Sequence, residues 1–508
     1  MRQPSATGVL VAAAAWVVGW TPSLLPGGSV LQGVSLGLLA ATGYAFGSMV
    51  AAVLSPVIRT GRWFTALAWA AAGLAVLSGL RLGRSEATQA ASLGTPQFAA
   101  NWLVSSAVGL AVVITLVAVA RGIRGVTRIL ADRLARIRSS SSDDESHPVV
   151  GWRPRLLAAG VVAVVGVGLG AAALAVTHRA FDAIDAATSG QQPPSSATRS
   201  GSAESSIEWS TLGRQGRDFV AGGDDPSTIR AFAGLNSAPD PRARADAAVA
   251  DMLRAGGGQA EVWIGITTTG NGFVDPVAAQ AAETVSDGRA ALVAIQYSTL
   301  PSWLAFLIDQ PAAKEAGIAL FDSLRAARDA LPEGQRPRLV LYGESLGAYG
   351  SPAPFAGLDP EQVAGQIDGA LWVGPPAATD PITDWTYRGS PPVWQPVVDA
   401  GRVARYAATD ASTGDPPPGS QPWPDPHILV LQNPTDPVVW FSPRLVWQHP
   451  PWLASPRGPG VDPDTRWTPL LFFLQVALDL PQAVDFPSGV GHNYSDALQR
   501  AWEQILTP

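Results

Sequence analysis

A serine between two glycines is the first group in this sequence that could do chemistry. Ser345 lies in the stretch GESLG (343–347), and this Gly-x-Ser-x-Gly pattern is typical of a nucleophilic serine held on a sharp turn between a strand and a helix. The apolar run RLVLYG (338–343) before it predicts the strand. Such a serine could attack a carbonyl carbon, provided that a base removes its proton.

A histidine is the expected base, and the sequence offers five. His147 and His178 lie in or beside the apolar N-terminal half, and His427 begins a predicted strand. His492 lies in the glycine-rich segment GVGHNY near the end of the chain. A loop histidine after the last strands suits a base for this serine, so we expect His492 to fill the role, with His449 as the alternative.

An acid should orient the histidine ring and stabilise its charged form. Asp436 follows the apolar run HILVLQ (427–432) and is fixed by the proline after it. We expect Asp436 to be this acid, with Asp380, which follows an earlier apolar run, as the alternative. The chain order Ser345, Asp436, His492 supports this choice.

Backbone N–H groups should hold the oxyanion that forms during attack. The N–H of Leu346, directly after the serine, is one candidate. The second donor is expected in the loop after the strand two places before the serine's strand, which makes Thr268 and Thr269 the candidates. The segment GLNSA (234–238) is the alternative if one strand is miscounted.

Aromatic residues are expected to line the substrate pocket. The candidates are Trp440 and Phe441, which follow the predicted acid, and Trp303. These rings suit an apolar acyl pocket or the membrane interface, while simple packing of a loop-rich surface is the alternative. A segment rich in Pro, Trp and Asp, about 377–426, predicts a cap-like insertion.

The elements that must position these residues alternate along the second half of the chain. Uninterrupted apolar strands separated by helical segments are typical of an α/β fold, with a mostly parallel sheet and helices on both faces. Helices are predicted in 240–257, 275–287 and 312–331, and strands at 228–235, 261–268, 289–297, 338–343, 369–374 and 427–432.

The first half of the chain predicts an α-helical transmembrane domain. A helix needs roughly 20 apolar residues to cross a bilayer, and about five runs satisfy this length. Arginines cluster before the first run, after the second and between the fourth and fifth, which places those loops and the N-terminus in the cytoplasm. The runs are 8–25, 29–57, 64–80, 99–120 and 156–177.

With about five spans, the C-terminal domain is extracytoplasmic, and a miscount of one span would invert it. The predicted domains are a transmembrane domain (1–180), a flexible Ser-, Gly- and Pro-rich linker (181–206) and a catalytic domain (207–508). The expected location is therefore the cytoplasmic (inner) membrane, with membrane lipids as partners.

Composition excludes several other classes of protein. The first 180 residues hold 14 arginines and 5 acidic residues, whereas the rest holds 20 basic and 36 acidic residues. An acidic second half argues against a nucleic-acid partner. Without cysteine, paired histidines or an Asp-rich loop, neither a metal nor a cofactor is expected.

At these residues the chain resembles the actinobacterial membrane-anchored α/β-hydrolase family, in which a multi-span N-terminal domain precedes a hydrolase domain. The resemblance covers nearly the whole chain and implies that the family's serine falls on Ser345. It names no substrate. The stretches that carry it are TLGRQGRDFV (211–220), IQYSTLPSWLAFL (295–307), YGESLGAYG (342–350), GALWVGPP (369–376), QNPTDPVVWF (432–441) and GVGHNY (489–494).

The expected activity is that of a serine esterase, lipase or thioesterase on lipid-like or acylated substrates of the cell envelope. An acyltransferase that moves an acyl group to a sugar or lipid hydroxyl would use the same three residues. A non-catalytic membrane scaffold or transport component is the alternative from another class.

Overall fold

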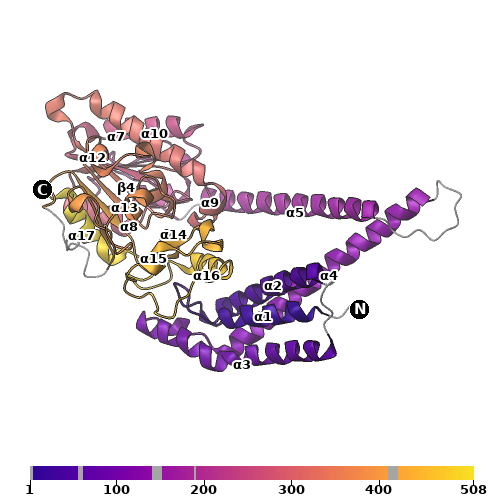
Figure 1. The fold of residues 1–508 in the computed structure, drawn as a ribbon. Helices are drawn as coiled ribbons and strands as arrows, with labels where there is room; N and C mark the ends of the chain where they lie inside the picture. The colour runs from indigo at the N-terminus through magenta and orange to yellow at the C-terminus, as the bar shows by residue number, and fades with distance from the viewer. Residues whose placement is uncertain (1–3, 55–60, 140–151, 188–189, 410–421, 508) are drawn as a thin grey trace. The chain divides into compact units, whose positions relative to one another are not determined.

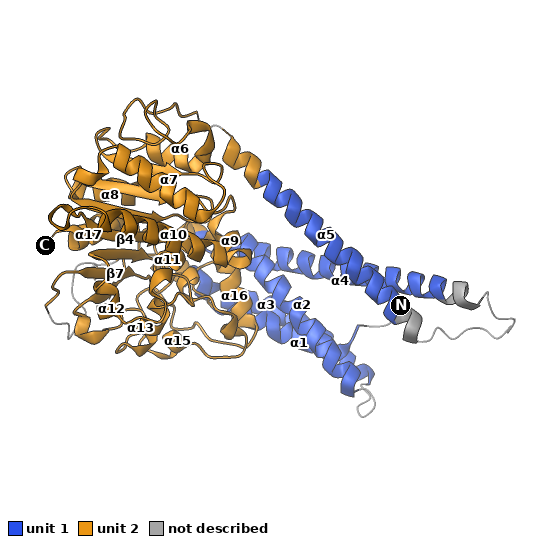
Figure 2. Cartoon of the chain, turned by 90° about the horizontal axis from the view of Figure 1, so that it is seen from above, with its two compact units in different colours: residues 1–21, 27–87, 98–180 blue, residues 22–26, 88–97, 181–508 orange. Residues whose placement is uncertain are grey.

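The computed structural model describes residues 4–54, 61–139, 152–187, 190–409 and 422–507. Its chain forms two compact units, coloured separately in Figure 2. The first unit holds residues 1–21, 27–87 and 98–180, and the second holds 22–26, 88–97 and 181–508. The second unit therefore includes two short segments from the N-terminal half of the chain.

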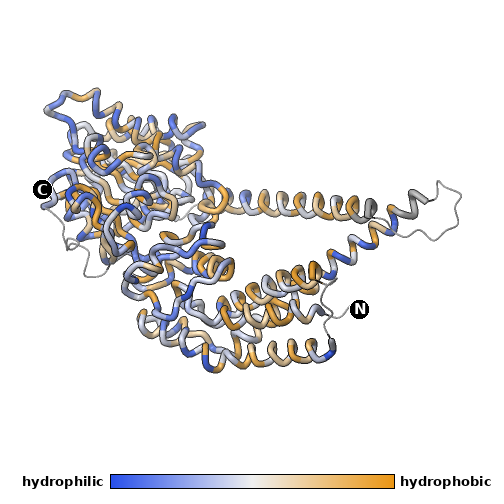
Figure 3. The backbone as a smooth tube through the Cα atoms, in the orientation of Figure 1, coloured by the Kyte–Doolittle hydropathy of each residue, from blue (hydrophilic) through white to orange (hydrophobic). Residues whose placement is uncertain are grey.

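Long apolar helices build the first unit, and their hydrophobic residues stand out in Figure 3. Among the described residues, four helices are long and apolar enough to cross a membrane. They are α2 (Gly28–Leu54), α3 (Arg62–Ser92), α4 (Trp102–Ser139) and α5 (Trp152–Ala186).

The predicted first span, 8–25, is wrong as a span. Helix α1 covers only Ala6–Val18, 13 residues, and is therefore about 20 Å long at 1.5 Å per residue. The hydrocarbon core of a bilayer is about 30 Å thick. Pro22 lies in the rest of the predicted run and Pro26 directly follows it. Proline inside a helix removes a hydrogen bond and clashes with the preceding turn.

A seven-stranded sheet in the order β1-β3-β2-β4-β5-β7-β6 forms the centre of the second unit. All neighbouring strands are parallel, which confirms the predicted parallel α/β sheet. The strands are β1 (Ile229–Ala233), β2 (Val262–Thr267), β3 (Ala290–Ile295), β4 (Arg338–Glu344), β5 (Gly369–Val373), β6 (Ala404–Ala407) and β7 (His427–Leu431).

Two layers of helices cover this sheet (Figure 1). Helices α7 (Pro241–Arg254) and α10 (Gln310–Asp329) pack on each other, α7 against β1 and β3 and α10 against β2 and β3. Helices α8 (Pro276–Val285) and α17 (Ser495–Leu506) also pack on each other, α8 against β3 and α17 against β5 and β7. The strands between these layers are almost entirely buried, as their uninterrupted apolar sequences predict.

The predicted flexible linker, 181–206, is largely a packed part of the second unit. Helix α5 continues to Ala186. Arg199 and Ser200 are buried, and Arg199 forms a β-bridge with Arg230 of β1. The Ser200 hydroxyl donates to the Asp251 carboxylate at 2.6 Å. Polar residues rich in Ser and Gly resemble a tether in sequence, but here they are fixed by hydrogen bonds to the sheet.

The predicted cap-like insertion, 377–426, is only partly a cap. It contains helix α13 (Ile382–Arg388) and the edge strand β6, which pairs with β7. Residues 410–421 lie outside the described part of the chain. One edge of the sheet is therefore built from within this segment.

Candidate active site

Ser345 occupies the sharp turn that its sequence motif predicts. It follows β4 and has φ 54° and ψ −125°, a strained conformation for a residue with a side chain. Helix α11 (Leu346–Gly350) begins directly after it. A Cβ atom at Gly343 would collide with the carbonyl oxygen of Gly347, and one at Gly347 would collide with that of Thr267. Both motif glycines are therefore needed for the close approach of strand and helix.

His492 and Asp436 form a buried pair. His492 Nδ1 lies 2.6 Å from Asp436 Oδ2. The other carboxylate oxygen accepts the Val438 N–H at 2.8 Å, because Asp436 caps helix α14 (Pro437–Trp440). Tyr494 also donates its hydroxyl to Oδ2, at 2.7 Å. Because the carboxylate accepts this hydrogen bond, Nδ1 carries the hydrogen and Nε2 is left as an acceptor.

The serine and the histidine approach the same edge of the sheet from neighbouring strands. The Ser345 N–H donates to Val373 O at the end of β5. The next residue, Gly374 (φ +55°), lies so close to the His492 ring that a Cβ atom there would collide with Cε1. Because β4, β5 and β7 are adjacent, the residues after their carboxyl ends meet at one place.

The side chains of Ser345 and His492 are not joined by a hydrogen bond. Ser345 Oγ instead lies 3.0 Å from Ser302 Oγ. His492 Nε2 is buried and has no hydrogen-bond partner among the residues that the structure describes. The site therefore contains an unused acceptor on His492, while the hydroxyl of Ser345 is paired with Ser302.

Neighbouring charges set the acid–base properties of this site. Burial lowers the pKa of His492, but the charge and hydrogen bond of Asp436, together with the charge of Glu344, raise it more, so the net shift is upward. Burial, reinforced by Asp275, raises the pKa of Glu344 to about 7. Glu344 directly precedes Ser345 and accepts a hydrogen bond from Tyr342.

Comparisons with known sequences agree with this geometry. The sequence model of the alpha/beta-hydrolase family matches residues 229–508, and the model of the N-terminus of that family matches residues 20–224. The chain belongs to the alpha/beta-hydrolase family. No protein of curated function and no solved structure matches it. The family resemblance seen in the sequence is thus confirmed, while an actinobacterial origin stays a prediction.

In this alpha/beta-hydrolase, the alternative base His449 and the alternative acid Asp380 make contacts outside the Asp436–His492 pair. His449 is exposed and packs edge-on against Trp467. Asp380 accepts the Gly357 N–H at 3.0 Å. Both ring nitrogens of His427 face backbone carbonyl oxygens. Of the acids and bases that the sequence predicted, the structure therefore pairs Asp436 with His492.

The sheet order identifies the loop that faces the serine. Strand β2 lies beside β4, so the loop after β2 is adjacent to the serine turn, whereas the alternative segment, 234–238, follows the edge strand β1. Thr269 is wrong as an oxyanion donor because its N–H already donates to Phe273 O at 3.0 Å. Leu346 and Thr268 remain the predicted donors.

The three predicted pocket residues of the hydrolase differ in their burial. Trp440 is buried and its indole N–H donates to Asn433 O at 3.1 Å. Phe441 is also buried and packs against Phe306 and Phe473. Trp303 is 44% exposed.

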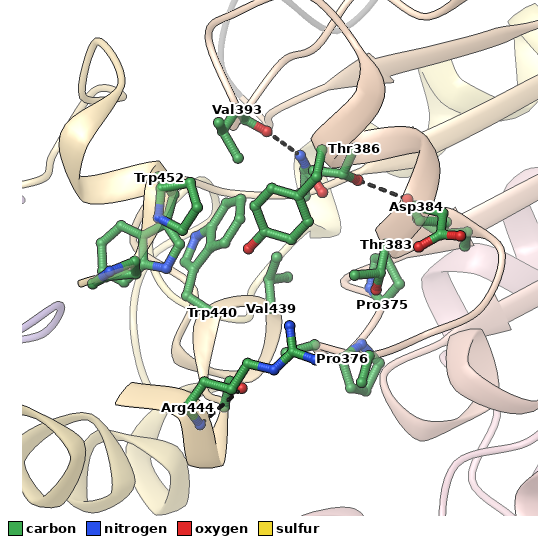
Figure 4. A pocket seen from close by; sticks show the side chains of 18 of the residues that line it. Pro375, Pro376, Thr383, Asp384, Thr386, Val393, Val439, Trp440, Arg444 and Trp452 are labelled. Carbon is green, nitrogen blue, oxygen red and sulfur yellow. Dashed lines mark hydrogen bonds between the residues drawn. The ribbon is translucent and has the colours of Figure 1, made fainter. Parts of the chain in front are cut away.

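A cavity of about 1010 Å³ opens between the first part of the insertion and the segment after Asp436 (Figure 4). Trp440 and Trp452 stand together on one wall, and Arg444 points into the space. Trp303 and Phe441 are absent from its described lining, as are the serine, acid and histidine of the site. Gly374 connects the cavity with the serine, acid and histidine site, because it lies against the His492 ring and Pro375 of the cavity wall follows it directly.

Sequence reasoning missed three contributors to the site. Tyr494 lies within the GVGHNY segment, two residues after the histidine, and that position was its only signal. Glu344 stands inside the serine motif itself. Ser302 is 43 residues from Ser345, and nothing in the sequence indicates their contact. No group of metal-binding side chains is found among the described residues.

Proposed function

We propose that this protein is a membrane-anchored serine hydrolase that cleaves ester or thioester bonds of lipid-like substrates of the cell envelope. The observation that carries the proposal is the buried pair of His492 and Asp436 beside the strained turn of Ser345. A strained serine with an imidazole acceptor nearby is the arrangement that nucleophilic attack on a carbonyl requires.

In the proposed reaction, Ser345 Oγ attacks the carbonyl carbon and its proton passes to His492 Nε2. The oxyanion accepts hydrogen bonds from the Leu346 N–H and from the loop at Thr268. When the tetrahedral intermediate collapses, the leaving alcohol or thiol takes the proton from Nε2, and an acyl group remains on Ser345. Water then attacks this ester while His492 Nε2 takes its proton, and Nε2 returns that proton to Ser345 Oγ as the acid is released.

The contact between Ser345 and Ser302 must break before this reaction begins. The reaction requires Ser345 Oγ to exchange Ser302 Oγ for His492 Nε2, and we assign this exchange to a change of the serine rotamer. Hydrogen bonds of catalytic groups are often long or absent until substrate binds. We therefore interpret the described arrangement as a resting state.

The proposed location is the cytoplasmic membrane, with the hydrolase unit on the extracytoplasmic side. Two observations support it. Arg59 precedes α3 in the sequence and Arg62 begins it, and the other clustered arginines lie in the second half of α4 and the first residues of α5, so they share one side. Residues 22–26 and 88–97 belong to the hydrolase unit, and both segments lie on the opposite side from those arginines if α2 to α5 each cross once. This orientation follows from α2 to α5 alone, so it holds although α1 is too short to span.

A fluorophosphonate probe tests the proposal, because it labels a serine that an adjacent base has activated. The full-length protein should be labelled, and Ser345→Ala should abolish the labelling. Ser227→Ala is a matched control, since Ser227 is exposed and its side chain donates to the neighbouring Asp225. A folded wild-type protein that takes no label would favour the non-catalytic scaffold.

Hydrolysis and acyl transfer form the same acyl-enzyme. They differ in whether water or another hydroxyl then attacks it. The two are separated by the products formed from a labelled ester when an alcohol or a sugar is added. Free acid alone indicates a hydrolase, whereas a new ester of the added hydroxyl indicates a transferase. Lipid analysis of cells that carry Ser345→Ala would then identify the ester that accumulates.

A further inference from the structure

Helix α9 (Ser302–Ile308) has an apolar face that the described residues leave exposed. Trp303, Leu307 and Ile308 are 44%, 53% and 46% exposed. Among the described residues of this unit, no other helix carries three large apolar side chains that are exposed to this extent. Exposed apolar groups gathered in this way mark a surface that binds lipid or another protein.

The other face of α9 reaches the candidate active site. Ala305 and Phe306 are buried, and the Phe306 ring packs edge-on against Phe441 at 6.4 Å between ring centres. Ser302, the first residue of the helix, lies 3.0 Å from Ser345 through their hydroxyl oxygens. A single short helix therefore connects an exposed apolar surface with the nucleophilic serine.

The last candidate membrane span ends beside the segment that leads into α9. Asp182, in the final turns of α5, accepts a hydrogen bond from Thr299 at 2.7 Å. Asp185 accepts another from Gln296 at 3.1 Å. The apolar run of α5 extends to Thr177, and five residues of helix rise about 7.5 Å. Thr299 therefore contacts a residue of α5 that follows the end of the apolar run by only five positions in the chain.

We propose that the exposed face of α9 docks in the interfacial layer of the lipid bilayer. The short distance to the end of α5 selects lipid as the occupant rather than a soluble partner. Tryptophan is enriched at this depth of a membrane, and short amphipathic helices bury an apolar face there. The consequence for substrate rests on the proposed function: Ser345 would receive esters from the bilayer itself.

The absence of cysteine from the chain permits a direct test. Leu307→Cys carries a nitroxide in the full-length protein, reconstituted into vesicles of phosphatidylcholine and phosphatidylglycerol. Leu253→Cys is the matched control, because Leu253 of α7 is also an exposed leucine, at 36%. Power-saturation measurements compare collisions with oxygen, which concentrates in lipid, and with a water-soluble nickel chelate.

Docking predicts that the label at residue 307 collides several-fold more with oxygen relative to nickel than the label at residue 253. Equal ratios at the two positions would overturn the proposal, because α9 would then lie in water. Protection of residue 307 from both reagents would also overturn it, since a protein surface, such as a second copy of the chain, would then cover the helix.

A second measurement links docking to substrate delivery. Leu307→Gln should reduce turnover of an ester embedded in vesicles about tenfold relative to turnover of a short-chain soluble ester. An unchanged ratio of the two rates would contradict delivery from the bilayer. If the wild type hydrolyses neither ester, the proposed function fails, while the collision measurement still decides whether α9 docks.

Discussion

The Nδ1 atom of His492 lies 2.6 Å from Oδ2 of Asp436, although 56 residues separate them in the chain. Both side chains are almost completely buried. The carboxylate also accepts the Tyr494 hydroxyl and the Val438 N–H, so it is held from three directions. The imidazole therefore keeps one orientation and one tautomer, with Nε2 available as an acceptor.

Asp436→Asn should reduce the rate of fluorophosphonate labelling roughly 10³- to 10⁴-fold. The amide keeps the shape of the side chain but cannot stabilise the charged imidazole, and it favours the wrong tautomer. The measurement is the second-order labelling rate of the purified protein. Asp380→Asn is the control, because among the described residues its carboxylate accepts a hydrogen bond from the backbone N–H of Gly357. This variant should label within about threefold of the wild type.

The pH dependence of labelling should follow the titration of His492. Its net pKa lies above the ordinary value of 6.5 because Asp436 and Glu344 together outweigh burial. Only the neutral ring can accept the Ser345 proton, so the rate should rise with pH through a midpoint above 6.5. Loss of the Glu344 charge in Glu344→Gln should move this midpoint to lower pH. A midpoint that moves upward in this variant would contradict the assignment.

Gly374→Ala should abolish labelling by displacing the His492 ring. The added methyl group would collide with Cε1 of the imidazole, and the backbone is in the left-handed region (φ +55°). Gly357→Ala separates these two effects, since Gly357 also has a positive φ (+77°) but a Cβ atom there would meet nothing within 4 Å. Each variant should lose about 1 kcal/mol of stability from backbone strain, but only Gly374→Ala should lose activity.

Most of the sheet and the central residues of the site could be predicted because their signals are local. Apolar runs predicted every strand but β6, whose four residues lie within a proline-rich segment. The strained turn at Ser345 follows from glycines within two residues of it. In contrast, the Thr269 N–H is used by a turn to Phe273, and a tight turn of this kind was not evident from the residues.

Contacts between distant segments could not be predicted from the residues alone. Nothing in the stretch PSLLP (22–26) indicates that it belongs to the hydrolase unit. Ser302 and Ser345 are in contact because helix α9 begins beside the serine turn. The position of that helix depends on the fold of the whole domain. Such pairings arise from packing of the complete fold rather than from local propensity.

Glu344→Gln should change how stability depends on pH. The pKa of Glu344 is raised from 4.5 to about 7 by burial and by Asp275, so the folded protein favours the protonated acid. Its contribution to stability is fully present below the unfolded pKa and is lost as pH rises to about 7. Because Glu344 is only half-buried, we expect a gain on the order of 1–2 kcal/mol for the glutamine variant at high pH.

Urea unfolding in detergent at about pH 5 and about pH 8 measures this difference. The two proteins should unfold at similar urea concentrations at the lower pH, and the variant should be the more stable at the higher pH. Equal behaviour at both values would show that Glu344 is ionised in the folded protein across this range.

Asp479→Ala should destabilise the hydrolase unit and slow labelling of Ser345. Asp479 ends helix α16 (Leu471–Asp479), and its carboxylate accepts the N–H groups of Leu24 and Leu25 at 3.1 and 3.3 Å. Four residues later, Ala483 O accepts the His492 N–H at 2.7 Å. Removal of a buried carboxylate with several donors costs roughly 2–4 kcal/mol, and the segment that holds the histidine backbone then loses its support.

The control for this variant is Asp485→Ala, because Asp485 is exposed and lies only six residues further along. It should unfold within about 0.5 kcal/mol of the wild type and label at the normal rate. If Asp479→Ala behaved like this control in both measurements, residues 22–26 would not stabilise the hydrolase unit. A loss of stability without slower labelling would instead show that this segment supports the fold but does not position His492.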